Sequence, residues 1–221
     1  MKIVIVGGVA GGATAAARIR RLDEQAEIVV FERSGFVSYA NCGLPYYIGE
    51  VIDDPEDLTL QTPESFFSRF RVDMKVHHEV TAIHPDQKSV SVKNLETGAV
   101  FEESYDKLLL SPGAKPVIPD LPGIDSSKLF TLRTVEDTYR IKEFVDRNKP
   151  KSAVIVGGGF IGLEMAENLR HLGMEVTIVQ RPKQLMNPFD SDMASFIHSE
   201  VRKHGVKLML GHTVEGFAEQ D

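Results

Sequence analysis

Two stretches of the chain share one pattern of apolar and polar positions. Apolar, β-branched runs at 2–6 and 153–156 each lead into glycines and then into a helix-forming stretch. A further strand is predicted after each helix, at 27–31 and 175–179. This order of strand, glycine turn, helix and strand is typical of a parallel βαβ unit, so the sequence predicts an α/β protein with two such units. Because the strands are apolar at successive positions, we expect burial on both faces of each sheet.

The region between the two copies has a different pattern. Short strands are predicted at 73–78, 89–94 and 100–103, which is typical of a small antiparallel meander. The apolar run at 108–110 predicts a buried strand. The many proline and glycine residues from 112 to 123 predict a crossover without regular structure.

The later part of the chain returns to helices and strands. A helix is predicted at 135–148, and we place the domain boundary just after it, which gives domains 1–149 and 150–221. Beyond the second βαβ unit, a helix is predicted at 191–204 and a strand at 205–210.

Composition narrows the class of protein. The chain has 221 residues, 42% hydrophobic and 26% charged, as expected of a globular protein. A formal charge of −7 argues against nucleic-acid binding, and no apolar run reaches the roughly 20 residues of a membrane span. The first residues do not form a signal peptide. The single cysteine, Cys42, excludes an internal disulfide and predicts a cytoplasmic setting.

The second glycine motif carries a specific chemical expectation. Gly157, Gly159 and Gly162 form a complete G-x-G-x-x-G between a predicted strand and a predicted helix. Glycines at this spacing allow a tight turn, a close approach of the backbone to a pyrophosphate, and close packing of helix on strand. The motif therefore predicts a dinucleotide site, and the alternative is a glycine-rich turn that binds nothing.

The first glycine motif is incomplete. Gly7 and Gly12 hold its first and third positions, but Val9 stands at the second. Gly8 and Gly11 flank these positions and let the backbone shift to compensate.

The residues at the ends of the second strands differ between the copies. Glu32 ends the strand of the first copy, where a carboxylate accepts hydrogen bonds from the ribose hydroxyls of an adenosine. The second copy has Gln180 followed by Arg181, so no carboxylate repels a 2′-phosphate and a guanidinium is available to bind one. NADPH is therefore allowed there; the alternative is that Arg181 points to solvent.

The surroundings of Cys42 leave two interpretations open. Pro45 suits the first turn of a helix, and a cysteine just before a helix is stabilised as a thiolate by the helix dipole. Ser38 and Asn41 offer hydrogen bonds beside it. The alternative is a small buried apolar residue, the usual fate of a free cysteine.

Other polar groups give weaker signals. Thr14, Arg18 and Arg21 share one face of the first helix, so they form either a site for a phosphate-bearing substrate or a solvated helix face. The histidines lack the spacing of metal ligands, and no metal site is expected.

These motifs together resemble the pyridine nucleotide–disulfide oxidoreductase family. The resemblance covers essentially the whole chain and is closest to the single-cysteine branch of coenzyme A-disulfide reductases and NADH-dependent per- and polysulfide reductases. The stretches that carry it are Val6–Gly12, Phe31–Arg33, Ser38–Tyr47, Leu60–Glu64, Leu110–Ala114 and Gly157–Glu164. Tyr47 stands five residues after Cys42, so the C-x4-C disulfide of other family members is excluded.

The resemblance implies an architecture and a set of site residues. It implies two Rossmann-like three-layer domains, each with a parallel sheet and a small antiparallel meander. The first domain would bind FAD, through Gly7, Gly8, Val9, Gly11, Gly12, Glu32, Arg33, Ser111, Pro112 and Gly113. The second would bind NADPH or NADH, through Gly157, Gly159, Phe160, Ile161, Gly162, Glu164, Gln180 and Arg181. Coenzyme A would contact Thr14, Arg18, Arg21, Ser38 and Asn41.

The implied reaction passes electrons from NAD(P)H through FAD to a mixed disulfide on Cys42, and the substrate is coenzyme A disulfide or a per- or polysulfide. One alternative is an NADH oxidase or peroxidase that forms a Cys42 sulfenic acid. Another is a non-catalytic nucleotide-binding redox module.

Family members are longer than this chain. The expected fold is therefore an N-terminal fragment that lacks the C-terminal part, and the intact enzyme is expected to be a cytoplasmic homodimer.

Overall fold

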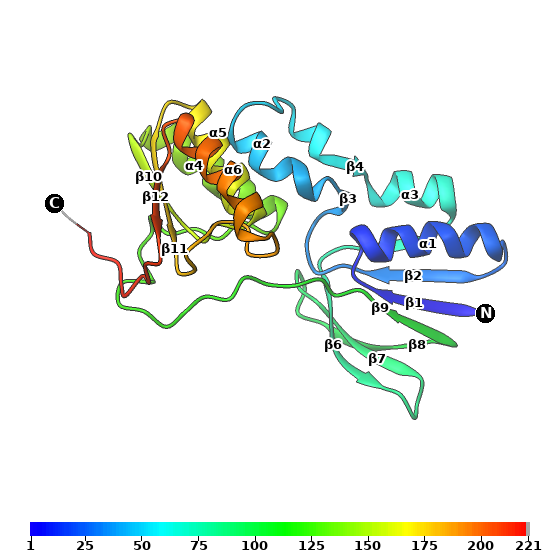
Figure 1. The fold of residues 1–221 in the computed structure, drawn as a ribbon. Helices are drawn as coiled ribbons and strands as arrows, with labels where there is room; N and C mark the ends of the chain where they lie inside the picture. Colours follow the sequence, from blue (N-terminus) through cyan, green and yellow to red (C-terminus); the bar gives the residue numbers. More distant parts are fainter. Residues whose placement is uncertain (220–221) are drawn as a thin grey trace. The chain divides into compact units, whose positions relative to one another are not determined.

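The computed structural model describes residues 1–219, and its contacts divide the chain into two compact units (Figure 1). Unit 1 contains Met1–Ala40 and Glu56–Ala114, and unit 2 contains Asn41–Pro55 together with the chain from Lys115 onward. This division differs from the expected boundary between 149 and 150. Two segments N-terminal to that boundary pack with the second βαβ unit instead.

Unit 1 is built on a four-stranded parallel sheet in the order β5-β2-β1-β9. The strands are β1 (Lys2–Val6), β2 (Glu27–Phe31), β5 (Asp73–Lys75) and β9 (Lys107–Leu110). Helix α1 (Ala10–Leu22) connects β1 to β2 in the predicted βαβ order.

Apolar side chains cover the central strands on both faces. On one face, Ile3 and Ile5 of β1 share a core with Ala13 and Ala16 of α1. On the other, Val4 of β1 packs with side chains of a three-stranded antiparallel meander. Its strands are β6 (His78–His84), β7 (Ser89–Asn94) and β8 (Val100–Ser104). The expected burial on both faces is confirmed for β1, and unit 1 has three layers.

Short elements complete unit 1. Strands β3 (Val37–Tyr39) and β4 (Thr59–Gln61) form an antiparallel pair. Helix α3 (Pro63–Phe70) begins with a capping box, in which the Thr62 hydroxyl accepts from the Ser65 N–H and the Ser65 hydroxyl accepts from the Thr62 N–H.

Unit 2 has a three-stranded parallel sheet in the order β10-β11-β12. Its strands are β10 (Ser152–Val156), β11 (Glu175–Gln180) and β12 (Lys207–Leu210), joined by α5 (Phe160–His171) and α6 (Ser191–Lys203). The described part of unit 2 has no antiparallel meander like that of unit 1.

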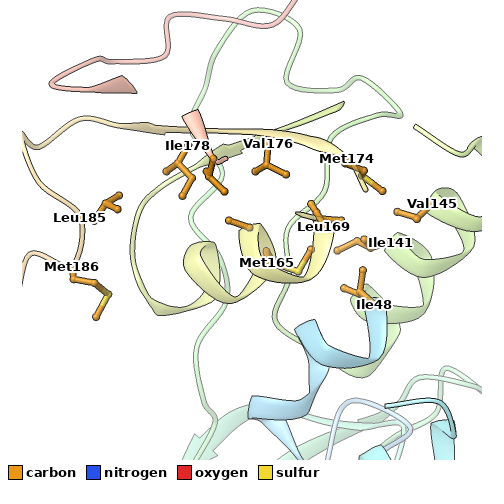
Figure 2. Packing of buried hydrophobic residues seen from close by; sticks show 12 residues of the cluster. Ile48, Ile141, Val145, Met165, Leu169, Met174, Val176, Ile178, Leu185 and Met186 are labelled. Carbon is orange, nitrogen blue, oxygen red and sulfur yellow. The ribbon is translucent and has the colours of Figure 1, made fainter. Parts of the chain in front are cut away.

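Two further helices join the core of unit 2. Helix α2 (Leu44–Ile48) contributes Ile48, and α4 (Val135–Asn148) contributes Ile141 and Val145. Figure 2 shows these side chains beside Leu169 of α5. Gly49 allows this packing, because a Cβ there would lie 2.1 Å from the Asn168 Oδ1. The shared core explains why α2 and α4 belong to unit 2.

Strand β10 departs from the expected burial. The side chains of Ala153 and Ile155 pack against the core, but Val154 and Val156 are 66% and 57% exposed. Ala153 and Ile155 are the residues of β10 that pack against the unit 2 core. The prediction of burial on both faces is therefore wrong for this strand in the described chain.

Most predicted elements are found at or near their expected residues, with a few corrections. The strand expected at 73–78 is two strands, because His77 takes a left-handed conformation (φ 55°) between β5 and β6. Strand β9 is an edge strand, and Leu110 is 54% exposed rather than buried. The crossover from 111 to 134 has no helix or strand, as expected. Among the described residues, no helix is long and apolar enough to cross a membrane.

Candidate nucleotide and thiol sites

The first glycine turn is held by contacts that only glycine permits. Gly7 leaves β1 with φ 97° and donates its N–H to the Phe31 carbonyl at 2.8 Å. A Cβ on Gly12 would lie 1.7 Å from the Gly7 oxygen, so α1 approaches the turn too closely for any side chain. Helix α1 begins after Val9 with no side-chain cap and no acidic residue in its first turn. Its open N–H groups suit a pyrophosphate.

Glu32 lies beside this turn, at the end of β2. Its Oε2 accepts the Gly8 N–H at 2.7 Å and its Oε1 accepts the Ser34 N–H at 2.8 Å. Both bonds fix the half-buried carboxylate while leaving lone pairs for further donors. This geometry fits a group that accepts the ribose hydroxyls of a dinucleotide.

The crossover segment also reaches the first turn. Ser111 donates its N–H to the Val6 carbonyl at 2.8 Å, and its Oγ lies 2.3 Å from the position of a Cβ on Gly11. Gly113 has φ 70° two residues later, after the exposed Pro112. The structure thus brings the predicted Ser111–Gly113 segment to the predicted glycine turn.

Three predicted substrate residues of unit 1 are exposed on one helix. Thr14, Arg18 and Arg21 lie on the surface of α1. The neighbouring Arg20 has a structural role, since it donates to the carbonyls of Phe70 and Arg71. The helix therefore offers two exposed arginines near a glycine turn.

Two more predicted residues follow β2. Arg33 is exposed and forms an ion pair with Glu79 at 3.7 Å. Ser38 is half-buried with φ 47°, and it donates its N–H to the Gly8 carbonyl at 3.0 Å. Ser38 therefore supports the glycine turn through its backbone.

The second glycine turn repeats the first in unit 2. Gly157 has φ 109° and donates its N–H to the Val179 carbonyl at 2.9 Å, and a Cβ on Gly162 would lie 2.1 Å from the Gly157 oxygen. A Cβ on Gly157 or Gly159 would meet no atom within 4 Å. The turn is an open cradle, and α5 begins without a side-chain cap or an acidic residue in its first turn. These features fit a bound pyrophosphate.

Gln180 holds the position that Glu32 holds in unit 1. Its Oε1 accepts the Gly158 N–H at 2.9 Å and its Nε2 donates to the Gln184 carbonyl at 3.2 Å. Gln180 is buried, and Arg181 beside it is exposed. Positions 180 and 181, at the end of β11, therefore carry a cation and no carboxylate.

The predicted residues at the start of α5 differ in exposure. Phe160 and Ile161 are 64% and 49% exposed. Glu164, one turn further, is half-buried, and burial together with the nearby Glu167 carboxylate raises its pKa above the ordinary value. Phe160 and Ile161 thus offer apolar surface one turn before a carboxyl group whose pKa is raised.

Cys42 lies in a short 3₁₀ turn, Asn41–Gly43, just before α2, and its side chain is exposed. The buried alternative for this cysteine is therefore wrong. Pro45 lies in the first turn of α2, as predicted. Asn41 is held in place, because its Oδ1 accepts from Arg133 Nη1 at 3.3 Å.

Sequence reasoning missed the partners of Asn41 and Tyr46, two residues that lie close to Cys42 in the sequence. Arg133 lies 92 positions from Asn41 in sequence and is brought to it by the fold. Burial, together with the carboxylates of Glu167 and Glu164, raises the pKa of Tyr46 above the ordinary value, and a hydrogen bond to Glu167 adds to this. The only sequence signal is that Glu164 and Glu167 are three residues apart, which places both on one side of a helix.

Tyr47 takes the place that a second cysteine holds in the C-x4-C pattern. Its ring packs edge-on against Tyr139 of α4, with ring centroids 5.7 Å apart. Among residues 1–219, no group of three or more histidine, cysteine, aspartate or glutamate side chains could hold a metal ion.

Comparison with known proteins identifies the family. The model of the pyridine nucleotide-disulphide oxidoreductase family matches residues 1–221. The chain belongs to this family. A coenzyme A disulfide reductase from Staphylococcus aureus is 42% identical over 214 residues, which are 97% of this chain and 48% of that protein. The chain thus spans about half the length of the curated relatives that it matches.

Solved structures agree with this assignment. CoADR-RHD from Bacillus anthracis has a TM-score of 0.95 and 50% identity, covering 97% of this chain and 39% of its own. An NAD-dependent persulfide reductase from A. fulgidus has a TM-score of 0.94 and 33% identity, covering 100% and 42%. A water-forming NADH oxidase from Lactobacillus brevis has a TM-score of 0.92 and 35% identity, covering 100% and 48%.

Proposed function

We propose that the whole protein is a flavin-dependent NAD(P)H:disulfide reductase in which Cys42 carries the reacting sulfur. The observation that carries the proposal is the exposed thiol of the single cysteine, in a chain with two dinucleotide-type glycine turns. Because Tyr47 stands where the C-x4-C pattern has its second cysteine, Cys42 is proposed to form its redox disulfide with a small thiol. The similarity to coenzyme A disulfide reductase and persulfide reductase supports the same chemistry.

The two glycine turns divide the cofactors. Unit 1 holds FAD, with the Gly7–Gly12 turn at the pyrophosphate, Glu32 at the ribose and Ser111–Gly113 along the flavin. Unit 2 would hold the nicotinamide cofactor in its open turn, with Phe160 and Glu164 of α5 as further residues of this proposed site. When bound, FAD supplies the transfer of two electrons from the nicotinamide to sulfur.

Cys42 does the sulfur chemistry. Its thiolate attacks one sulfur of a disulfide, forms a mixed disulfide, and releases one thiolate product. Two electrons that originate from NAD(P)H then cleave this mixed disulfide, which releases the second thiolate and restores the Cys42 thiolate. One proton is taken up, so NAD(P)H, a proton and one disulfide give NAD(P)⁺ and two thiols. Asn41, held by Arg133, fixes the backbone turn beside the reacting sulfur.

Coenzyme A disulfide is the proposed substrate, and a per- or polysulfide is the other member of the same class. Thr14, Arg18 and Arg21 form an exposed polar stripe of the kind that binds phosphate groups, and coenzyme A carries phosphates. Ser38 and Asn41 complete the proposed contacts. A per- or polysulfide has no phosphates, so it would not need this stripe.

NADPH is the proposed electron donor. Gln180 places an amide where a carboxylate would repel a 2′-phosphate, and the exposed Arg181 supplies positive charge. The proposal also includes a homodimer and the cytoplasmic setting expected from the single cysteine.

A second candidate is an NADH oxidase or peroxidase, in which Cys42 cycles through a sulfenic acid. The 35% identity to the Lactobacillus brevis NADH oxidase supports it. The intact mass of the purified protein separates the two. We expect an adduct of one coenzyme A, localised to Cys42, that is lost on treatment with a reductant. A Cys42 that carries oxygen and never coenzyme A would contradict the proposed substrate and favour the oxidase.

The non-catalytic module is tested by a separate measurement. We expect the purified whole protein to show the visible absorption bands of bound flavin. A colourless protein that still binds NADPH would favour the module over the reductase.

A further inference from the structure

The segment after the second strand docks on the glycine turn in both units. In unit 1 this segment places Val37 under Gly8, where a Cβ on Gly8 would lie 3.1 Å from Val37 Cγ1. In unit 2 it places Leu185 under Gly158, where the corresponding distance to Leu185 Cδ2 is 2.3 Å. Val37 and Leu185 each lie five positions after the equivalent residues Glu32 and Gln180. The two segments are therefore structural equivalents.

Backbone contacts extend the equivalence by one residue. Ser38 donates its N–H to the Gly8 carbonyl at 3.0 Å, and Met186 donates its N–H to the Gly158 carbonyl at 2.8 Å. Both donors have a left-handed conformation, with φ 47° at Ser38 and 51° at Met186. A conformation that L-residues rarely adopt must be held by its surroundings.

The two units hold this segment in different ways. In unit 1, Val37 and Ser38 belong to β3, which pairs with β4. In unit 2 the described chain has no strand at 181–190. Instead, the Leu185 N–H donates to Nε2 of His198, on α6, at 3.0 Å.

We propose that His198 is a positioning residue for the nucleotide site of unit 2, because it takes the role that β4 has in unit 1. The bond fixes Leu185 beneath Gly158 and so fixes the segment that carries Arg181 and Lys183 beside the open glycine cradle. Exposed Arg181 and Lys183 are the cations of this segment, so His198 acts through them on the binding of a 2′-phosphate. The inference rests on the proposed NADPH function and names a residue that orients its site.

The bond requires a neutral imidazole. A backbone N–H can donate only to an Nε2 that carries no proton, so His198 must have its proton on Nδ1. Burial and the positive charge of Arg202, one turn away on α6, lower the pKa of His198 below the ordinary value. On the facing elements, segment Gln184–Met186 carries no charge, and Lys207 of the neighbouring β12 is exposed. The bond is therefore present at neutral pH and is lost when acid protonates Nε2.

The test compares dissociation constants for NADP⁺ and NAD⁺, measured by calorimetry on the flavin-loaded whole protein. These oxidised nucleotides do not reduce the flavin. In His198→Leu, which keeps the volume but has no acceptor, we expect NADP⁺ to bind about tenfold more weakly, the equivalent of one lost hydrogen bond. NAD⁺, which lacks the 2′-phosphate, is expected to lose clearly less. In His198→Gln, whose Oε1 can accept the Leu185 N–H, we expect most of the NADP⁺ affinity to return.

The pH profile gives a readout that a general loss of stability would not move. As the pH falls from about 8 to about 5, NADP⁺ affinity should decrease more in the wild type than in His198→Gln. The histidine at position 198 gains a proton as the pH falls, whereas the glutamine does not. The 2′-phosphate of NADP⁺ titrates in the same way with both proteins, so the difference between the wild type and His198→Gln does not contain its contribution.

Two outcomes would overturn the inference in distinguishable ways. If the wild type binds neither nucleotide, the proposed function and the inference both fail. If the wild type binds NADP⁺ and His198→Leu binds it equally well, the proposed function stands and the role of His198 is wrong. Equal losses of NADP⁺ and NAD⁺ in His198→Leu, with no rescue in His198→Gln, would also overturn it.

Discussion

The two glycine turns have the same backbone bonds in different surroundings. In each unit, the first glycine of the turn donates its N–H to a backbone carbonyl near the end of the second strand. The next glycine donates its N–H to the side chain of the residue one position further along the chain. These pairs are Gly7–Phe31 and Gly8–Glu32 in unit 1, and Gly157–Val179 and Gly158–Gln180 in unit 2. The side chain at the last position is charged in one unit and neutral in the other.

The first strands of the two units also differ in burial. Val4 in β1 is fully buried under the antiparallel meander, whereas Val154, at the equivalent position of β10, is 66% exposed. The motif therefore fixes the turn, while residues outside the motif decide which nucleotide fits and how deeply the strand is buried. Each prediction below exchanges or removes one of these differences.

The largest effect is expected at the glycines themselves. Gly12→Ala would place a Cβ against the Gly7 oxygen, and we expect it to lower the free energy of unfolding of unit 1 by about 4 kcal/mol. Gly159→Ala meets open space and should change the stability of unit 2 by less than about 0.5 kcal/mol. Urea unfolding of the 221-residue chain measures both. Equal losses of unfolding free energy in Gly12→Ala and Gly159→Ala would show that a side chain is tolerated equally at the two positions.

The paired valines should give the next largest difference. Val4→Ala removes two buried methyl groups, and we expect a loss of about 2 kcal/mol in the free energy of unfolding. Val154→Ala in the same 221-residue chain should cost less than about 0.5 kcal/mol. A cost at Val154 as large as that at Val4 would mean that this face of β10 is covered in solution.

Exchanging the strand-end side chains tests the nucleotide preference. In Gln180→Glu the carboxylate can still accept the Gly158 N–H, as Glu32 accepts that of Gly8. Its charge opposes a 2′-phosphate, so we expect the dissociation constant of NADP⁺ to rise about tenfold and that of NAD⁺ to stay the same or fall. Direct binding measurements check this. Unchanged discrimination between the two nucleotides would place the 2′-phosphate elsewhere.

The smallest effect concerns Glu164. Burial and Glu167 raise the pKa of this carboxyl in the folded chain above its value in the unfolded chain. Ionisation of Glu164 therefore destabilises the fold at pH values above its unfolded pKa. Glu164→Gln should therefore increase the free energy of unfolding by about 0.5 kcal/mol at about pH 8. The gain should disappear at about pH 3, which lies below the ordinary pKa of a glutamate, so the carboxyl is protonated in both states. Urea unfolding at the two pH values decides it, and a gain of equal size at both would contradict the assignment.

Sequence reasoning predicted the parts of the fold that local chemistry determines. The βαβ units were predictable because continuous apolar strands lead into glycine turns whose first residue, Gly7 or Gly157, has a positive φ. Strands β3 and β4 and helix α3 were not predicted, because each is short and depends on its neighbours rather than on its own periodicity. The exposure of Leu110 and Val154 depends on which elements cover a sheet, and an apolar run alone cannot indicate this.

In the candidate site, too, the motif residues were predictable and the tertiary contacts were not. Gly7, Glu32 and Gln180 could be assigned from motif spacing, and the structure places each beside its turn. The exposure of Cys42 is a tertiary property, and two interpretations of its neighbourhood were equally consistent with the sequence. Arg133 donates to Asn41 from 92 positions away, and His198 accepts from Leu185 13 positions away; neither belongs to a motif.

The most direct test of the account is the anaerobic titration of the whole flavoprotein and of its Cys42→Ser variant. We predict that NADPH reduces the flavin in both proteins, because neither glycine turn is altered. Coenzyme A disulfide should then reoxidise the flavin of the wild type and leave that of the variant reduced, because only the wild type has the sulfur that forms the mixed disulfide. If the variant is reoxidised by coenzyme A disulfide as fast as the wild type, Cys42 is not the reacting thiol and the central claim is wrong.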